Sequence, residues 1–351
     1  MDFKHKKFGK FTVSRTLPKN LQNQDIVLFE TELKRTFKSP KVFIKRNIYI
    51  DNSKLKKYKY FRSYSNHWRM SNFWLKHKIK FFIEDFLLFI ANLRNAKKDI
   101  EVIEKASWVL DQKSWKYMHF YSDALQRIEL ISNYLNEYPI VISSNYSDYR
   151  YTVDTLDILK IPYIVINKDK LYCVKELLIS SHVAPAGNYN VEIIQSVSGK
   201  IKEASNIQEN ILNKKYWISR KNASMRNVLN SNEVDLLLTK YNYQVLYLED
   251  LETREQISTL SKAKVIAGLQ GAGLNNILFM HPDTNVLEIR DRKDNKNNCY
   301  FSLASALNIN FYYSHADTVE PGNFHSSDYI IDIKSLEKAF ENIENNLLLQ
   351  D

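Results

Sequence analysis

The chain has 351 residues, of which 44% are hydrophobic and 13% aromatic, and this composition excludes an intrinsically disordered protein. Its length exceeds that of one typical core, so two domains are expected. The two cysteines, Cys173 and Cys299, have no metal-ligand spacing, which argues against a disulfide framework or a zinc site and fits a reducing compartment.

Positive charge is concentrated near the N-terminus. The net charge is +10, and residues 1–80 contain 21 Lys and Arg against 5 Asp and Glu, with aromatic residues interleaved. Such a segment suits an anionic membrane surface or a nucleic acid, or it is simply a solvated basic surface. No RNA- or DNA-binding motif accompanies it, so no nucleic-acid partner is predicted.

The N-terminus also lacks the apolar region of a signal peptide. Its most apolar segment, residues 86–93, is far shorter than the roughly 20 residues of a transmembrane helix. Residues 76–93 are predicted to form a helix, either in the core or at a bilayer interface. We therefore expect a cytoplasmic protein that can lie on the inner face of the plasma membrane, with an anionic membrane surface as a partner of residues 1–93.

The first half of the chain alternates between helical and strand patterns. Apolar residues at helical spacing predict a helix over residues 107–135, and residues 151–159 predict another. Residues 139–143 and 162–166 are typical of buried strands, and residues 171–180 form a further element. This order predicts a parallel α/β layer. Pro185 and Gly187 then interrupt the pattern and mark a hinge.

The alternation restarts after the hinge, so each half is large enough for its own sheet. The predicted domains are residues 1–187, with a basic, aromatic-rich part over 1–100, residues 188–334, and a C-terminal helix over 335–351. The predicted strands are residues 215–219, 243–247, 264–267 and 285–289, and the predicted helices are residues 206–213, 231–241, 253–262, 300–307 and 335–348.

Three of only seven glycines, Gly268, Gly271 and Gly273, fall within six residues, directly after a predicted strand. Glycine lets a backbone approach a ligand closely, and the N–H groups that open a helix attract phosphate. The amides of Gly271, Ala272, Gly273 and Leu274 could therefore bind a diphosphate. The alternative is a tight strand-to-helix turn. The spacing matches neither a P-loop nor the dinucleotide fingerprint.

Two other stretches carry candidate chemistry. Arg220 and Arg226 follow a predicted strand, and arginine at a strand end can bind phosphate in a bidentate way, although the stretch could also be an ordinary surface loop. His119, Asp123 and Arg127 are spaced four residues apart, so they share one face of a helix. A histidine beside a carboxylate can move a proton, although such pairs also occur on ordinary surfaces.

These stretches occur in the order and approximate spacing of a known family. Over about residues 108–315 the chain resembles glycosyltransferase family 61, in its bacterial capsular or surface-polysaccharide branch. Residues 263–279, AKVIAGLQGAGLNNILF, with the later Pro and Val-Leu-Glu-Ile, are similar to the family's His-Gly-Ala-Gly-Leu-x-Asn, Phe, Pro and Glu-Ile/Leu pattern. The Ser-Arg … Arg … Asn stretch from 219 to 230 and the His-x-x-x-Asp stretch from 119 to 123 also resemble the family's segments. The chain has Gln270 where the family usually has His.

The resemblance implies an α/β protein of the GT-B fold, with two facing Rossmann-like domains and a central cleft. It implies an inverting glycosyltransferase that moves a sugar from a nucleotide-sugar donor to a growing surface glycan of a capsule or a lipopolysaccharide or lipooligosaccharide. The acceptor would be a glycan or a lipid-linked glycan. No cofactor is expected. No metal is expected either, because no two aspartates lie two residues apart in the chain.

The resemblance also assigns roles to the matched positions. Asp123 is the candidate base that deprotonates the acceptor hydroxyl, His119 is the second candidate, and Arg127 is assigned to the acceptor. The donor-binding residues would be those that stabilise the leaving diphosphate, namely Arg220, Arg226 and the amides of Gly271, Ala272, Gly273 and Leu274, together with Gln270 and Asn275 on the donor and Glu288 on the ribose hydroxyls.

Three other kinds of protein stay open. A nicotinamide-dependent or other nucleotide-binding enzyme would share the α/β pattern but lacks its glycine fingerprint here. A non-catalytic GT-B-like subunit of a polysaccharide assembly complex is kept open by Gln270. A nucleic-acid binder would act through residues 1–80.

Overall fold

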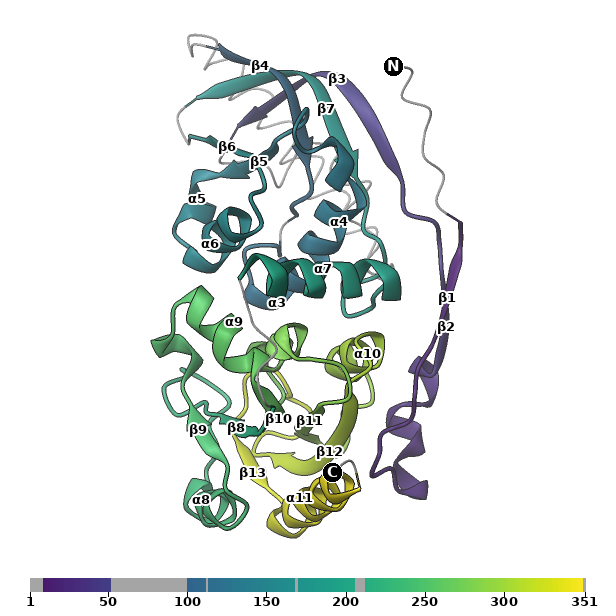
Figure 1. Ribbon diagram of the computed structural model, residues 1–351, viewed down its shortest axis with the longest axis vertical. Coiled ribbons are helices and arrows are strands. Elements are labelled where there is room, and N and C mark those ends of the chain that lie inside the picture. The colour runs from purple at the N-terminus through teal and green to yellow at the C-terminus, as the bar shows by residue number, and fades with distance from the viewer. Residues whose placement is uncertain (1–8, 52–99, 112, 168–169, 206–211, 350–351) are drawn as a thin grey trace. The chain divides into compact units, whose positions relative to one another are not determined.

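The structure is a computed structural model that describes residues 9–51, 100–111, 113–167, 170–205 and 212–349 (Figure 1). The chain forms two compact units, one made of residues 1–10 and 38–186, the other of residues 11–37 and 187–351. The boundary between Ala186 and Gly187 falls inside the predicted hinge. The predicted helix over 76–93, the basic aromatic stretch from 52 to 99 and most of the predicted helix over 206–213 lie outside the described residues.

The first unit contains a five-stranded sheet in the order β3-β7-β4-β5-β6. Neighbouring strands are parallel except β3, which runs antiparallel to β7. Apolar side chains of these strands, including Trp108, Val141 and Val174, form its core. The prediction of a parallel α/β layer is therefore confirmed for this unit. The strands are β3 (Val42–Asp51), β4 (Ile100–Trp108), β5 (Ile140–Ser143), β6 (Tyr163–Ile166) and β7 (Leu171–Ser180).

The predicted helix over 107–135 is wrong at its start. Residues up to Trp108 belong to β4, because pairing with β7 along nearly the whole strand overrides the local helical pattern. The helical part is also irregular, since the π-helix η4 (Phe120–Ala124) lies between two short α-helices, and such turns are frequent at functional sites. The other helical elements are α3 (Tyr117–His119), α4 (Leu125–Leu130), η5 (Ser132–Tyr134), α5 (Ser144–Ser147) and α6 (Arg150–Ile158).

The second unit contains a six-stranded sheet in the order β13-β12-β11-β10-β8-β9, parallel except for β13. All four strands predicted here from sequence are present, and β12 and β13 were not foreseen. The elements are β8 (Lys214–Ile218), β9 (Gln244–Leu246), β10 (Ala263–Leu269), β11 (Asn285–Asp291), β12 (Asn310–Thr318) and β13 (Tyr329–Ile331), with α7 (Val191–Ala204), α8 (Ser231–Lys240), η6 (Leu248–Asp250), α9 (Thr253–Ser261), η7 (Ala272–Phe279), α10 (Cys299–Ala306) and α11 (Ile333–Leu348).

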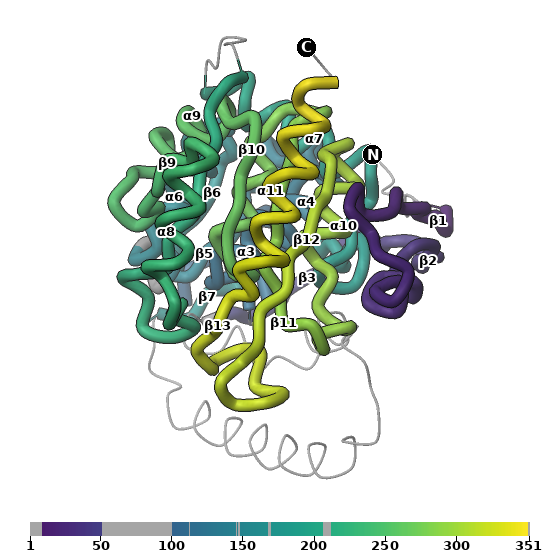
Figure 2. The backbone as a smooth tube through the Cα atoms, turned by 90° about the horizontal axis from the view of Figure 1, so that it is seen from below, coloured from purple at the N-terminus to yellow at the C-terminus, as the bar shows by residue number. Residues whose placement is uncertain are grey.

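Helices cover both faces of this sheet. On one face α8 and α11 share a core with alternate residues of the central strands, such as Leu287 and Ile289. Figure 2 shows α11 crossing these strands in yellow. On the other face α9 packs against β10, α10 packs against β12, and both contact η7. The C-terminal helix is thus part of the core of the second unit, since Leu336, Phe340 and Ile343 are fully buried.

Residues 11–37 pack with the second unit and not with the first, which differs from the predicted domain 1–187. They form an antiparallel pair, β1 (Phe11–Ser14) and β2 (Lys34–Phe37), with the 3-10 turns η1 (Asn23–Leu28) and η2 (Glu30–Glu32) between the strands. Phe29 is fully buried, and its ring packs against those of Phe301, Phe311 and Tyr313. Both views place this purple segment beside β12 and α10 (Figures 1 and 2).

None of the helices within the described residues is both long enough and apolar enough to cross a membrane.

The Phe29 contact predicts how strongly this segment belongs to the second unit. We expect Phe29→Ala to lower the free energy of unfolding by about 3–5 kcal/mol, because it removes a fully buried ring and leaves a cavity. Urea unfolding measures this change. Val27→Ala is the matched control from the same segment, since Val27 is 52% exposed and should change stability by at most about 0.5 kcal/mol. Equal, small effects of both substitutions would contradict the packing.

Candidate functional site

Two neighbouring parallel strands of the second unit end beside each other. Arg220 lies two residues after β8, and Gln270 and Gly271 follow β10, which pairs with β8 in parallel. Loops at the carboxyl ends of such strands are where α/β proteins bind ligands. The fold therefore brings together the arginine loop and the glycine cluster, which are about fifty residues apart in the chain.

Gly271 lies directly against two guanidinium groups. A Cβ added to Gly271 would lie 2.8 Å from Arg220 Nη1 and 3.6 Å from Arg226 Nη1. The first distance is shorter than any real contact of a Cβ, so a larger residue would displace Arg220. Glycine is needed here because two arginine side chains converge on the backbone turn.

Backbone carbonyls hold both arginines in place. Arg226 Nη1 donates to Gln270 O at 2.9 Å, while Arg220 donates to Arg226 O at 3.2 Å and to Met225 O at 2.9 Å. Arg226 has a φ of 60°, an uncommon conformation for a residue with a side chain. These bonds fix the positions of the two charges and leave their charge uncompensated.

The two arginines lack an anionic partner. Among the described residues, no carboxylate forms an ion pair with either guanidinium, and Arg226 Nε is buried without a hydrogen-bond acceptor. Burial, together with the neighbouring positive charge of Arg226, lowers the pKa of Arg220 to about 10, so it stays protonated at neutral pH. Two fixed like charges with an unused donor are suited to binding an anion such as a phosphate.

The remaining residues of the glycine cluster divide between ligand-facing and packing positions. Ala272 is exposed and Gly273 half-buried, but the Leu274 N–H donates to Gly271 O at 2.9 Å and is already used in the turn. A Cβ at Gly273 would lie 2.8 Å from a methyl group of Ile218, and one at Gly268 would lie 3.2 Å from its carbonyl oxygen. Both glycines therefore also serve the close packing of η7 and β10 on β8.

Gln270 and Glu288 point into the protein. Gln270 is 3% exposed, and its Nε2 donates to Glu288 Oε1 at 2.7 Å and to Asn297 O at 3.1 Å. Glu288 has no exposed surface and lies 3.6 Å from the Arg290 guanidinium. The predicted contact of Glu288 with ribose hydroxyls would require this region to open. Asn275, predicted to contact the donor, is also buried.

A second polar network lies in the first unit, at the carboxyl ends of β4 and β7. Asp111 follows β4 and His182 follows β7, and Asp111 Oδ2 lies 2.7 Å from His182 Nε2. Burial by itself would raise the pKa of Asp111, but His182, Arg127 and the Lys113 N–H together hold that pKa well below its usual range. The carboxylate is therefore charged at all ordinary pH values.

The predicted residues His119, Asp123 and Arg127 adjoin this network. His119 Nδ1 lies 2.7 Å from Asp123 Oδ2, and the side chain of His119 is 14% exposed while that of Asp123 is only 3% exposed. Arg127 is buried and its Nε donates to Ser180 O at 2.9 Å. Burial lowers the pKa of Arg127 to about 10, and the charges of Asp111 and Asp123 oppose that shift. The arginine therefore stays protonated between two aspartates.

Comparison with known families identifies the chain. Residues 117–287 match the family model described as Glycosyltransferase 61. Over this segment, the chain belongs to glycosyltransferase family 61. The resemblance seen in the sequence is thereby confirmed at the level of the family. A search of the curated proteins gave no match.

The family 61 segment spans both polar sites. It runs from the first residue of α3 to the middle of β11, so it includes the His119–Asp123 pair, the two arginines and the glycine cluster, and ends one residue before Glu288. Asp111 lies outside it, and His182 lies inside it.

Sequence reasoning missed Asp111 and His182. Asp111 was placed inside the wrongly predicted helix over 107–135, and His182 was assigned only to the hinge. Their signal is positional, since each follows a strand of a parallel pair, but it could be seen only once β4 was known to be a strand. Among the described residues, no group of three His, Cys, Asp or Glu side chains is arranged to hold a metal ion.

The buried Glu288 gives the glycosyltransferase a specific pH dependence. Burial raises the pKa of Glu288 to about 7 from its usual 4.5, although Arg290 and Gln270 act in the opposite direction. Between these pH values the folded state keeps a proton that the unfolded state releases. Folding stability should therefore fall as pH rises from 4.5 to about 7, by about 2–3 kcal/mol in total.

Urea unfolding at pH 5 and pH 8 measures this contribution. Glu288→Gln should remove most of the difference between the two pH values, because Gln does not titrate, whatever its effect on overall stability. The exposed Glu341→Gln on α11 is the control and should keep the pH dependence of the original protein. An unchanged pH dependence in Glu288→Gln would show that Glu288 titrates normally.

Proposed function

We propose that the protein is an inverting, metal-independent glycosyltransferase that moves a sugar from a nucleotide-sugar donor to a growing surface glycan of a capsule or of lipopolysaccharide or lipooligosaccharide. The second unit binds the donor and the first unit binds the acceptor, in a GT-B arrangement with the active site in the cleft. Membership of family 61 supports the glycosyl transfer itself.

The convergence of Arg220 and Arg226 on Gly271 is the observation that carries this proposal. When the bond between the anomeric carbon and the donor oxygen breaks, the leaving nucleoside diphosphate takes the electron pair and gains negative charge. Two guanidinium groups fixed by backbone carbonyls stabilise that charge without moving during the reaction. The amides of Ala272 and Gly273 open η7 beside them and add N–H donors.

The acceptor hydroxyl must lose its proton as its oxygen attacks the anomeric carbon. His119 takes this proton in our proposal, and Asp123 orients the ring and stabilises the imidazolium that forms. This assignment reverses the order of the two candidates given by the sequence, because His119 is the more exposed member of the pair. Arg127 then positions Asp123 and Asp111 and does not bind the acceptor directly, since its guanidinium is buried on Ser180 O.

The basic N-terminal part would hold the enzyme at the inner face of the plasma membrane, where a lipid-linked acceptor is presented. The described part of this region is too small to support the idea further. Binding of the full chain to anionic liposomes at low salt tests it, and the absence of any binding would reject it.

A non-catalytic subunit of an assembly complex is the second candidate. Gln270 stands where the family usually has His, and its amide hydrogens are both used inside the protein. Turnover by the purified protein decides between the two functions.

Nucleotide binding tests the donor site directly. A thermal-shift screen with nucleoside diphosphates and nucleotide sugars should show stabilisation by one nucleotide class, unchanged by EDTA. Arg220→Ala and Arg226→Ala should each weaken binding about 10- to 100-fold, because each removes a charged hydrogen-bond donor. Gly271→Ala should weaken it as well, since the added methyl displaces Arg220.

Arg46→Ala serves as the charge-matched control, because this exposed arginine lies on β3 of the first unit. It should bind the nucleotide like the original protein. Absence of a shift with every nucleotide would reject the donor site and favour the non-catalytic subunit.

Turnover tests the proposed base. With the donor identified, His119→Ala should lower kcat about 10²- to 10⁴-fold and leave the dissociation constant of the donor unchanged, because the proton acceptor is lost and the donor site is intact. Asp123→Asn should lower kcat less than His119→Ala, since it keeps the size of the side chain but weakens the orientation of the ring. Activity of His119→Ala near that of the original protein would refute the assignment.

A further inference from the structure

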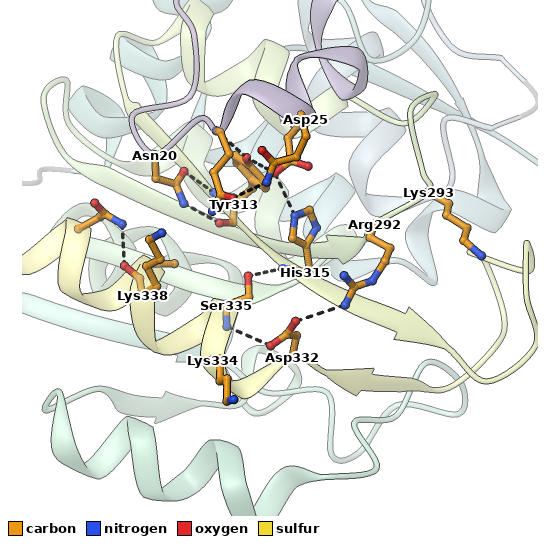
Figure 3. Close-up of a pocket in the computed structure, with 14 residues that line it drawn as sticks. Asn20, Asp25, Arg292, Lys293, Tyr313, His315, Asp332, Lys334, Ser335 and Lys338 are labelled. Carbon is orange, nitrogen blue, oxygen red and sulfur yellow. Dashed lines mark hydrogen bonds and ion pairs between the residues drawn. The ribbon is translucent and has the colours of Figure 1, made fainter.

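A cavity of about 570 Å³ lies in the second unit, away from the glycine cluster (Figure 3). It forms beside β12, because β13 pairs only with Ala316–Thr318 and leaves the earlier part of the strand to other partners. The N-terminal segment contacts this edge: the Lys19 N–H donates to Phe311 O at 2.8 Å, and the Asn20 side chain both donates to Tyr313 O at 2.8 Å and accepts from its N–H at 3.2 Å. The cavity is bounded by this segment, β12 and α11.

The cavity is lined almost entirely by polar side chains. Its carboxamides come from Asn20, Gln22, Gln24 and Asn342, and Ala339 is the one aliphatic residue among its lining residues. An apolar ligand would gain little contact there. The volume falls in the usual range for small-molecule sites. A hydroxyl-rich ligand the size of one or two sugar rings fits both properties.

Positive charge predominates in the lining. Arg292, Lys293, Lys334 and Lys338 face two carboxylates, those of Asp25 and Asp332. Arg292 is already held by Asp317 at 2.8 Å and by Asp332 at 3.3 Å.

The three lysines are not compensated in the same way. Among the described residues, no carboxylate pairs with the ammonium group of Lys293, Lys334 or Lys338. Lys334 and Lys338 lie four residues apart on the exposed face of α11, where like charges repel each other. An anionic group bound near them would remove that repulsion.

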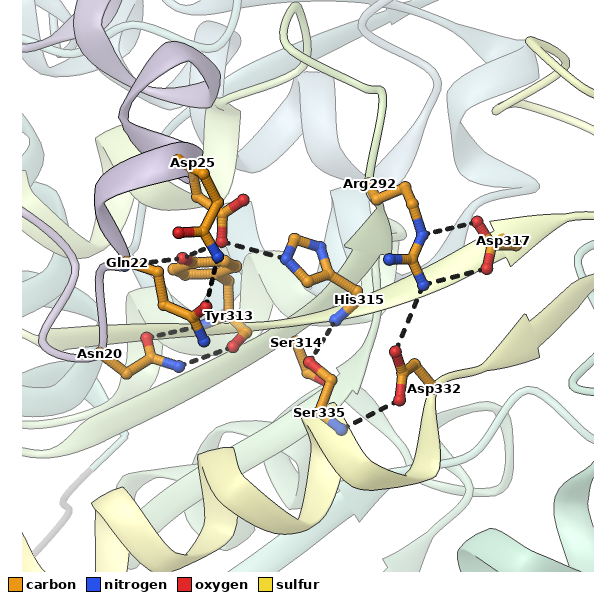
Figure 4. A network of polar contacts seen from close by, with 11 residues as sticks. Asn20, Gln22, Asp25, Arg292, Tyr313, Ser314, His315, Asp317, Asp332 and Ser335 are labelled. Carbon is orange, nitrogen blue, oxygen red and sulfur yellow. Dashed lines mark hydrogen bonds and ion pairs between the residues drawn. The ribbon is translucent and has the colours of Figure 1, made fainter.

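The wall opposite α11 is organised around Asp25. Its Oδ2 accepts a hydrogen bond from the Tyr313 hydroxyl at 2.6 Å and lies 3.1 Å from His315 Nε2, as Figure 4 shows. The Gln22 N–H donates to the Tyr313 hydroxyl at 3.2 Å. Asp25 Oδ1 makes no hydrogen bond within the described part of the chain, so it can accept one from a ligand hydroxyl. Burial and the neighbouring Asp25 raise the pKa of Tyr313, so this hydroxyl keeps its proton.

These two walls suit opposite ends of one ligand. A compact polyanion such as a diphosphate would be attracted by the lysines but repelled by Asp25 and Asp332. A sugar ring with a single carboxylate can direct that carboxylate to the lysines and its hydroxyls to Asp25 and the carboxamides. None of the predicted donor-binding residues lines the cavity, and β11 separates β12 from β10.

We propose that this cavity is a binding site for an acidic monosaccharide unit, a sugar ring that carries one carboxylate. It lies outside the proposed donor site, and it would bind an acidic unit of a glycan or a free sugar acid. The proposal goes beyond the transfer reaction, and its test measures binding and needs no turnover.

The first experiment measures binding of D-glucuronate and its methyl β-glycoside to the full chain at low salt by calorimetry, with D-glucose and inorganic phosphate as comparison probes. One saturable site is expected for glucuronate, with D-glucose binding at least about tenfold more weakly because it lacks the charge. Tighter binding of the methyl glycoside than of the free acid indicates a unit within a glycan, and the reverse indicates a free sugar acid; either result supports the site.

Two variants locate the binding. The double variant Lys334→Gln/Lys338→Gln should weaken glucuronate binding about tenfold or more, and folding should be preserved because both residues are exposed on α11. Lys214→Gln, which removes an exposed charge elsewhere in the same unit, should bind glucuronate normally. Asp25→Asn should weaken glucuronate binding but strengthen phosphate binding, because it removes a negative charge that accepts hydroxyls.

Three results would overturn the proposal. Glucuronate binding could be absent or equal in all variants. Phosphate could bind as tightly as glucuronate and depend on the same residues, which would mean that the cavity recognises charge alone. Lys334→Gln/Lys338→Gln could lose the thermal shift with nucleotides, which would make the cavity part of the donor site. Loss of nucleotide binding in Arg226→Ala, by contrast, concerns only the proposed function.

Discussion

The structure of the second unit depends on one costly arrangement, two guanidinium groups held against the same backbone turn with no carboxylate paired with either among the described residues. Like charges at this distance repel, and burial increases that repulsion. The protein tolerates it because both arginines donate to carbonyl groups that the fold has already fixed. Gly271 leaves the necessary space, and Gly268 and Gly273 bring their segments close enough to Ile218 to set the turn. A structural role alone gives no reason to keep such a repulsion, whereas an anionic ligand does.

The sequence predicted the parts of the fold where a local pattern and the long-range pairing agree. Strands such as β10 and β11 are short, continuous apolar runs between helices, which is typical of a parallel strand buried on both faces. β12 was not foreseen, because its residues, NFYYSHADT, mix aromatic and polar side chains. That mixture follows from its position, since Tyr313 and His315 face a polar cavity and Tyr312 faces the core. β4 was missed because its pairing with β7 acts across about seventy residues and leaves no local signal.

The candidate site was predictable to the same extent. Arg220, Arg226 and Gly271 could be found because they follow strand ends, where topology alone brings them together. The orientation of Gln270 and Glu288 could not, because it depends on register: Gly268 pairs with Glu288, which places the carboxylate inside the unit beside Arg290. A family pattern gives residue types, but only the sheet shows whether each side chain faces solvent or the core.

The two anion-binding features of this unit also differ in chemistry, and the difference follows from how each cation is anchored. At the glycine cluster the cations are arginines, whose planar groups are fixed by backbone carbonyls and can meet a diphosphate in one geometry. At the cavity the uncompensated cations are lysines on an exposed helix face, and their flexible side chains impose little geometry. Selectivity there must come from the opposite wall, where the N-terminal segment fixes Asp25 and the carboxamides. The packing of residues 11–37 on β12 is therefore a condition for ligand recognition as well as for stability, because without it the lysines would have no wall to face.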